Sequence, residues 1–192
     1  KMAAKSPEEQ EEFVKSVVDS IHVTTDAAKA VESTDLVIEA IIENMKIKKE
    51  LFSFLDSKAP AGAIFASNTS SLSISEVASA TKREDRFGGF HAFNPVPQMK
   101  LIEIVRTSQT SPETHETLVE VAKRMGKVPV SCKDSPGFIV NRLLVPYQLE
   151  ALRLGARGGA SPEDVGPAME LGGGCAMWAG EEAGVVGGGS RG

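Results

Sequence analysis

Short apolar runs alternate with helix-forming segments along most of the chain, and this alternation restricts the fold more than any other feature. Residues 36–41 and 63–67 have the pattern of buried strands, and residues 45–58 between them have an amphipathic helical pattern. A strand, a helix and a second strand in this order are typical of parallel strands joined by a crossover helix. The sequence therefore predicts an α/β layer fold with a doubly wound, mostly parallel sheet.

Further elements are predicted on both sides of this unit. In the helix at residues 45–58, we expect Met45, Leu51, Phe52 and Leu55 to face the core. The other predicted elements are helices at residues 6–20, 26–31, 74–80 and 112–125, strands at residues 21–24 and 127–131, and a strand pair around the N-P-V-P turn.

The character of the sequence changes after the stretch D-S-P-G at residues 134–137. A long apolar helix is predicted at residues 138–157, a further helix begins at Ser161, and strand patterns stop. We therefore expect residues 1–134 to form one domain and residues 135–171 to begin an all-helical segment. Half of the 18 glycines fall in residues 172–192, a density that disfavours packing, so we expect this tail to be disordered.

The composition argues against several classes of protein. A net charge of -5 argues against a general nucleic-acid surface, and no apolar run approaches the length of a membrane span. The two cysteines form no C-x-x-C motif, which fits a reducing, intracellular compartment, and no metal site is predicted. The chain opens at Lys1 without a signal or transit peptide, so we expect it to be a piece of a longer protein.

His91 and Glu103 lie the same distance on either side of Pro97, in G-G-F-H-A-F-N-P-V-P-Q-M-K-L-I-E-I-V. If the two apolar runs fold back as neighbouring strands, the imidazole and the carboxylate face each other. Glu103 shares a strand face with Leu101 and Val105, where an unpaired charge costs several kcal/mol. A histidine held by a carboxylate is the usual form of a general base. The alternative is a core histidine bonded to the backbone and a carboxylate that faces solvent.

Polar residues follow two of the predicted strands. The stretch N-T-S-S at residues 68–71 follows one strand, and Glu43 and Asn44 follow the other. Because ligands of open α/β sheets bind beyond the carboxyl ends of the strands, these groups are candidates for contact with a substrate or cofactor. The alternatives are structural, since Ser71 or Ser73 could cap a helix and an acid is favourable at any helix N-terminus.

Two asparagines are further candidates for the site. Asn94 precedes a proline, which favours an extended backbone and gives Asn94 a defined position close to His91. Asn141 lies on a mainly apolar stripe of the predicted long helix, where an amide needs a partner. The alternative for Asn141 is an ordinary polar residue at the start of a helix.

The segments S-N-T-S-S-L, H-A-F-N-P-V-P-Q-M-K-L-I-E-I and D-S-P-G-F-I-V-N-R-L-L-V-P-Y together resemble the L-3-hydroxyacyl-CoA dehydrogenase family, most closely its mitochondrial short-chain members in animals. The resemblance spans roughly residues 8–171. It implies a Rossmann-like NAD-binding domain followed by a helical domain for substrate binding and dimerisation. It also implies NAD as cofactor, an acyl-CoA as substrate, a homodimer, and a location in the mitochondrial matrix.

Members of that family oxidise the 3-hydroxyl of an L-3-hydroxyacyl-CoA to a ketone during fatty-acid β-oxidation. By resemblance, His91 is the base, Glu103 orients it, and Ser70 and Asn141 polarise the substrate oxygen. The positions that match cofactor contacts are Glu43, Lys48, Ser70 and Asn94, and Lys1 falls where a family lysine meets the CoA phosphates.

The sequence departs from the family pattern at both ends. The first βα unit with its glycine-rich loop does not precede Lys1, so we expect this chain alone to bind NAD weakly. After Gly172 the family's G-Y-P-M-G-P-F-E-like stretch is replaced by G-G-C-A-M-W, which bears on dimerisation. Two alternatives stay open: a 3-hydroxybutyryl-CoA dehydrogenase, or a catalytically impaired fragment that acts only as a binding or oligomerisation partner.

Overall fold

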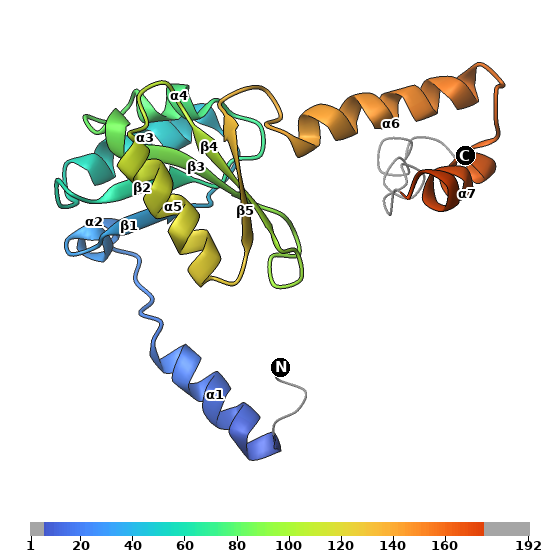
Figure 1. Ribbon diagram of the computed structural model, residues 1–192. Coiled ribbons are helices and arrows are strands. Elements are labelled where there is room, and N and C mark those ends of the chain that lie inside the picture. The colour runs from blue at the N-terminus through green and yellow to red at the C-terminus, as the bar shows by residue number, and fades with distance from the viewer. Residues whose placement is uncertain (1–5, 175–192) are drawn as a thin grey trace, which may run out of the picture.

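The computed structural model describes residues 6–174, and a five-stranded sheet in the order β1-β2-β3-β4-β5 forms its centre (Figure 1). The strands are β1 (Leu36–Glu39), β2 (Ile64–Ser67), β3 (Phe87–Ala92), β4 (Leu101–Arg106) and β5 (Val128–Lys133). Every neighbouring pair is parallel except β3 and β4, which are antiparallel. The predicted Rossmann-like α/β fold with a mostly parallel sheet is confirmed.

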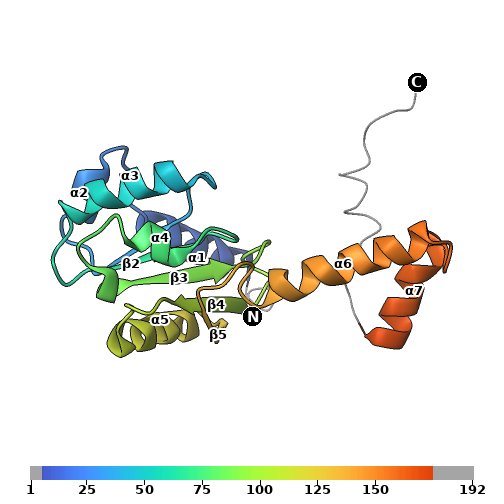
Figure 2. The same ribbon diagram turned by 90° about the horizontal axis from the view of Figure 1, so that it is seen from above.

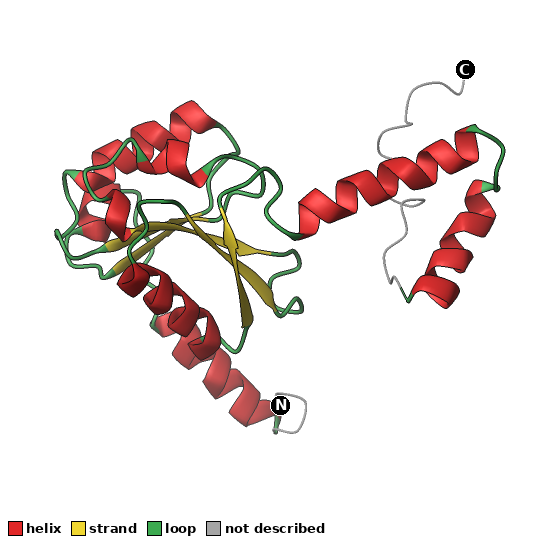
Figure 3. Cartoon of the chain, turned by 45° about the horizontal axis from the view of Figure 1, so that its top comes forward, coloured by secondary structure: helices red, strands yellow, loops and turns green. Residues whose placement is uncertain are grey.

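Helices cover both faces of this sheet. The α-helices of the described residues are α1 (Pro7–Asp19), α2 (Ala27–Val31), α3 (Met45–Asp56), α4 (Ile74–Ala78), α5 (Pro112–Arg124), α6 (Val140–Ala156) and α7 (Pro162–Gly173), and a short 3-10 turn lies at Glu84–Arg86. Figure 2 shows α3 and α4 above the sheet and α5 below it. The helices α1 and α6 extend away from the sheet on different sides (Figures 1 and 3), and neither contains a buried residue.

The core has one cluster on each face of the sheet. Between the sheet and α3, the ring of Phe52 lies 5.6 Å from that of Phe65 and 4.7 Å from that of Phe87. Between the sheet and α5, Ile104 and Leu118 are fully buried in the second cluster. Each such side chain contributes about 1.5–3 kcal/mol by its removal from water, so the two clusters fix the strands that carry the site.

The predicted core side of α3 agrees with the structure. Phe52 and Leu55 are buried, and Met45 and Leu51 pack partly buried against the same cluster. The sequence pattern did not distinguish Lys48, which is buried on the same helix.

Two glycines let a helix and the neighbouring strand approach β3 closely. A Cβ atom on Gly88 would lie 2.7 Å from Cδ1 of Leu118, and one on Gly89 would lie 2.7 Å from Cβ of Val105.

The predicted strand at residues 21–24 is wrong. These residues form no strand, and Val23 is 92% exposed. Residues 21–24 make no ladder hydrogen bonds, and β1 is the edge of the sheet, with no described residue paired to its outer side. For the same reason β1 is half-exposed rather than buried.

The helical segment follows β5, as the sequence predicts. The long helix begins at Val140, and Ser161 caps α7 with its side chain. The division near residue 135 stays a prediction. Of the predicted tail at residues 172–192, the described part ends α7 with Gly174 in the left-handed conformation. The rest of that tail and Lys1 lie outside the described residues. Within residues 6–174, no helix has the length and apolar character of a membrane span.

Candidate active site

The antiparallel pairing of β3 and β4 places His91 directly opposite Glu103. Nδ1 of His91 lies 2.8 Å from Oε2 of Glu103, and both side chains are buried. A carboxylate only accepts hydrogen bonds, so Nδ1 donates its proton, and in the neutral imidazole Nε2 then presents a lone pair. The structure thus brings together the pair that the symmetric placement about Pro97 predicts.

The other oxygen of Glu103 contacts the start of α6. Its Oε1 accepts hydrogen bonds from the backbone N–H groups of Ile139 and Val140, at 3.0 and 2.9 Å. These bonds and the contact with His91 offset the cost of burying a carboxylate in an apolar strand. The aromatic rings of Phe93 and Phe138 flank His91, with centroids 4.5 and 5.6 Å from the imidazole.

Ser70 lies beside Nε2, the ring nitrogen of His91 that does not contact Glu103. Its Oγ is 3.1 Å from Nε2 of His91, and its carbonyl oxygen accepts a hydrogen bond of 3.3 Å from Nδ2 of Asn141. Three residues that are distant in the sequence therefore meet at one point. A pocket of about 410 Å³ opens there between the loop after β2 and α6, and its lining includes Ser70, Ser71, Gly137, Asn141 and Val145.

The loop that carries Ser70 is held by Glu43. One oxygen of Glu43 accepts hydrogen bonds from the hydroxyls of Thr69 and Ser71 and from the N–H of Ser70. Burial alone would raise the pKa of Glu43. The hydrogen bonds from Thr69, Lys48 and Ser71 and the charge of Lys48 outweigh burial and lower this pKa. Glu43 is thus an ionised anchor for the loop as well as a candidate cofactor contact.

Lys48 lies inside the protein, behind Glu43. Its side chain is 1% exposed, and its Nζ lies 2.6 Å from Oε1 of Glu39 and 3.3 Å from Oε2 of Glu43. Ser67 donates a hydrogen bond of 2.6 Å to the other oxygen of Glu39. The predicted contact of Lys48 with a cofactor stays a prediction. In the structure the ammonium group lies between the carboxylates of Glu39 and Glu43. Sequence reasoning missed Glu39, although a charge in the apolar run L-V-I-E-A-I is the same signal that singled out Glu103.

Asn94 is placed differently from the other predicted residues. It lies exposed in the turn after β3, and within the described chain no hydrogen bond joins its side chain to His91. The peptide bond between Asn94 and Pro95 is cis.

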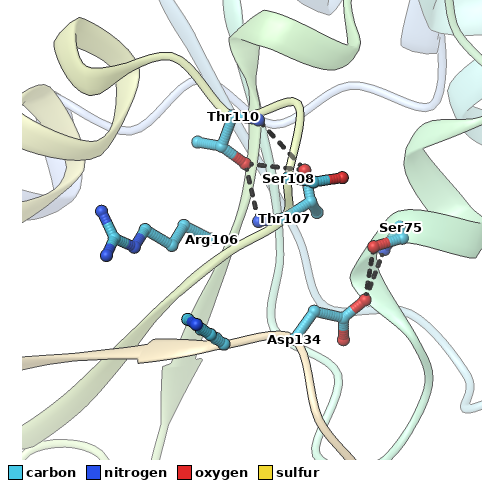
Figure 4. A pocket seen from close by; sticks show the side chains of 7 residues that line it. Ser75, Arg106, Thr107, Ser108, Thr110 and Asp134 are labelled. Carbon is cyan, nitrogen blue, oxygen red and sulfur yellow. Dashed lines mark hydrogen bonds between the residues drawn. The ribbon is translucent and has the colours of Figure 1, made fainter.

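Asp134, which sequence reasoning did not single out as a site residue, fixes the connection from β5 to α6. Its carboxylate accepts hydrogen bonds from the N–H groups of Ile74 and Ser75 and from the hydroxyls of Ser73 and Ser75. Figure 4 shows Asp134 directed at Ser75, in a second pocket of about 530 Å³ that also includes Arg106. Burial would raise the pKa of Asp134, but the hydrogen bonds from Ser75, Ser73 and Ile74 lower it.

Thiol chemistry is not expected at this site. Cys132 lies on β5, and burial, with the nearby charges of Glu103 and Asp134, raises the pKa of its thiol to about 11. Among residues 6–174, no group of three histidine, cysteine or acidic side chains is arranged to hold a metal ion. The described site therefore offers a histidine base, a hydroxyl and an amide, which together suit proton transfer to or from an alcohol.

Comparison with known proteins identifies the two parts of the chain. The family model for the NAD binding domain of 3-hydroxyacyl-CoA dehydrogenase matches residues 1–135, and the model for its C-terminal domain matches residues 137–188. The second match continues past Gly172, where the sequence departs from the family's expected stretch.

Individual relatives and solved structures agree with these matches. The mitochondrial hydroxyacyl-coenzyme A dehydrogenase of Sus scrofa is 59% identical over 92% of the chain and 56% of its own length. The Homo sapiens protein of the same name is 59% identical over 87% of the chain and 53% of its own length. The chain thus spans about half the length of these curated relatives.

Among solved structures, (S)-3-hydroxybutyryl-CoA dehydrogenase from Ralstonia eutropha superposes with a TM-score of 0.87 and 39% identity, over 93% of this chain and 64% of that one. Sequence and structural similarity therefore extend through both the sheet and the helical segment. The chain belongs to the 3-hydroxyacyl-CoA dehydrogenase family.

Proposed function

We propose that this protein oxidises the 3-hydroxyl of an L-3-hydroxyacyl-CoA to a ketone with NAD, as a step of fatty-acid β-oxidation. The observation that carries the proposal is the buried pair of His91 and Glu103, with the free Nε2 directed at Ser70. Family membership supports the substrate class, and the geometry supports the proton-transfer step.

His91 is the general base in this proposal. Its Nε2 takes the proton of the substrate hydroxyl, which occupies a position close to that of the Ser70 hydroxyl. Glu103 holds the proton on Nδ1 and stabilises the imidazolium that forms. Ser70 and the amide of Asn141 donate hydrogen bonds to the oxygen as it becomes a carbonyl.

The edge of the sheet beside His91 fits the nicotinamide end of NAD. Glu43 follows β1 with its side chain 41% exposed, and Ser70 follows β2 and is exposed, so both lie beyond the carboxyl ends of parallel strands. NAD, when bound, accepts the hydride that leaves the carbon bearing the hydroxyl. In this proposal Glu43, Ser70 and Asn94 contact the cofactor, and Lys48 holds Glu43 in place.

The name of the mammalian relatives, which includes the word mitochondrial, supports a location in that organelle, and the matrix is proposed from family resemblance alone. The acyl-CoA substrate enters by the pocket between Ser70 and Asn141 in this proposal. A homodimer is proposed by family membership, and α6 offers apolar surface for it, since Leu143 and Leu152 are 69% and 51% exposed.

A second candidate is a 3-hydroxybutyryl-CoA dehydrogenase, which would use the same residues on a four-carbon acyl group. The similarity to the Ralstonia eutropha enzyme favours it. The two candidates differ in acyl length and not in the chemistry of His91.

A substrate panel tests the proposed function. NADH formation by the full-length protein would be followed by absorbance with the L and D isomers of 3-hydroxybutyryl-CoA and with L-3-hydroxyacyl-CoAs of increasing length. We expect turnover of L isomers only, and the length dependence separates the two candidates. Absence of turnover with every L isomer, by a folded protein, would contradict the proposal.

A further inference from the structure

The two oxygens of Glu103 bind partners of different kinds. Oε2 holds the imidazole of His91 at 2.8 Å, whereas Oε1 accepts the N–H groups of Ile139 and Val140 at 3.0 and 2.9 Å. The side chain of Glu103 is 0% exposed, so water does not compete for either oxygen. A single carboxylate therefore contacts both the histidine and the first turn of α6.

The helix α6 has no cap of its own. Ile139 occupies its N-cap position, makes no side-chain cap hydrogen bond, and the first turn contains no acid. All other α-helices of the described chain begin with a capping side chain, namely Ser6, Asp26, Asn44, Ser73, Ser111 and Ser161. The first N–H groups of any helix lack intrahelical partners, and an anion is favourable beside them. Glu103 supplies that anion from β4, 36 residues earlier in the chain.

The backbone before α6 turns so that the N–H groups of Ile139 and Val140 reach Glu103. Gly137 and Phe138 have φ angles of 77° and 51°, in the left-handed region. Such a conformation costs roughly 1–3 kcal/mol for a residue other than glycine and persists only where the surroundings enforce it. Phe138 is buried beside His91, and the two hydrogen bonds to Glu103 follow directly after it.

We propose that Glu103 is the N-terminal cap of α6 and thereby a positioning residue for Asn141, in addition to orienting His91. Asn141 is the second residue of α6, one position after Val140, so the same carboxylate fixes the base and the amide that face Ser70. The catalytic meaning of this arrangement rests on the proposed function, whereas the cap itself does not.

Two substitutions of similar size separate the two roles of Glu103. In E103Q the amide oxygen still accepts from α6, but the amide NH2 donates to Nδ1 of His91 and moves the imidazole proton to Nε2. In E103L both contacts are lost while the volume is kept. The readouts are amide hydrogen exchange at Ile139 and Val140, followed by NMR, and the histidine tautomer from ¹⁵N chemical shifts.

We expect E103Q to retain the exchange protection of both amides within about threefold while its tautomer is reversed. We expect the exchange protection of these amides to fall roughly ten- to hundredfold in E103L. This factor corresponds to the free energy of a hydrogen bond to a charged group. Where the proposed function holds, kcat of E103Q falls roughly 100- to 10,000-fold although α6 stays capped.

Protection of Ile139 and Val140 in E103L equal to that of the unsubstituted protein would overturn the proposal. If E103L does not fold, amide exchange in the unsubstituted protein decides the question. Uncapped first-turn amides exchange at nearly the unprotected rate, so exchange of Ile139 and Val140 at that rate would overturn the proposal. These exchange results do not depend on enzymatic activity, so a failure of the proposed function would be seen separately as the absence of turnover.

Discussion

Replacing Lys48 with methionine is expected to destabilise the protein by about 3–5 kcal/mol, the usual cost of breaking a buried ion pair by removing one partner. The structure gives this value its basis, because Lys48 and Glu39 are 1% and 0% exposed and lie 2.6 Å apart. Methionine keeps most of the apolar stem, so the loss comes from the charge and not from a cavity. The remaining Glu39 carboxylate would stay buried without a cation.

Two contacts moderate this cost. Ser67 and the N–H of Ile41 continue to donate to Glu39 at 2.6 and 2.7 Å, which favours the lower end of the range. A domain of this kind has a free energy of unfolding of about 5–15 kcal/mol in total, so even the lower value is large. Loss of Lys48 also removes a partner of Glu43 and loosens the loop that carries Ser70.

Urea unfolding at 25 °C, followed by circular dichroism, measures the effect. The matched control is Lys49→Met, because Lys49 makes only an exposed contact of 3.9 Å with Glu76 and should contribute less than about 1 kcal/mol. The double variant E39Q/K48M should regain part of the loss, since it removes the unpaired charge. A K48M protein within about 1 kcal/mol of the unsubstituted protein would refute this reasoning.

Two further predictions concern the frame of the site. Asp134→Ala should cost about 1–2 kcal/mol at pH 7 through lost hydrogen bonds to α4. The folded pKa of Asp134 is lowered, so its stabilisation is complete above its ordinary value of 3.8 and is lost as pH falls through the folded pKa. In urea unfolding, a difference between the two proteins that stays constant below pH 4 would contradict this assignment. Gly89→Ala should lower stability by about 1–3 kcal/mol in thermal unfolding, because the new Cβ would lie 2.7 Å from Cβ of Val105. Gly62→Ala, with no neighbouring atom within 4 Å, is its control, and equal effects of the two substitutions would be inconsistent with the packing described.

The sequence predicts most of the sheet because local patterns determine it. Alternating strand and helix patterns give β1 to β5, and the rigid turn at Pro97 gives the pairing of His91 with Glu103. Residues 21–24 show the limit of such patterns. Val23 is a β-branched residue of the kind that favours strands. A strand forms, however, only where a neighbouring strand pairs with its backbone N–H and C=O groups.

Contacts between distant elements could not be predicted from local patterns. The apolar run around Glu39 marks that carboxylate as buried, but no local pattern identifies Lys48 on the following helix as its partner. The cap of α6 by Glu103 joins positions 36 residues apart. The contact of Asp134 with the first turn of α4 is of the same kind, because the carboxylate arrives from the far end of β5.

The central claim is that His91 is the base in the oxidation of an alcohol. The most direct test is steady-state kinetics of His91→Gln in the full-length protein with acetoacetyl-CoA and NADH. The matched control is His115→Gln, a histidine on α5 that contacts Ser131 and lies outside the proposed site. We expect kcat of His91→Gln to fall roughly 100- to 10,000-fold, with the affinity for NAD largely spared and the control unaffected. Near-normal turnover by His91→Gln would contradict the account.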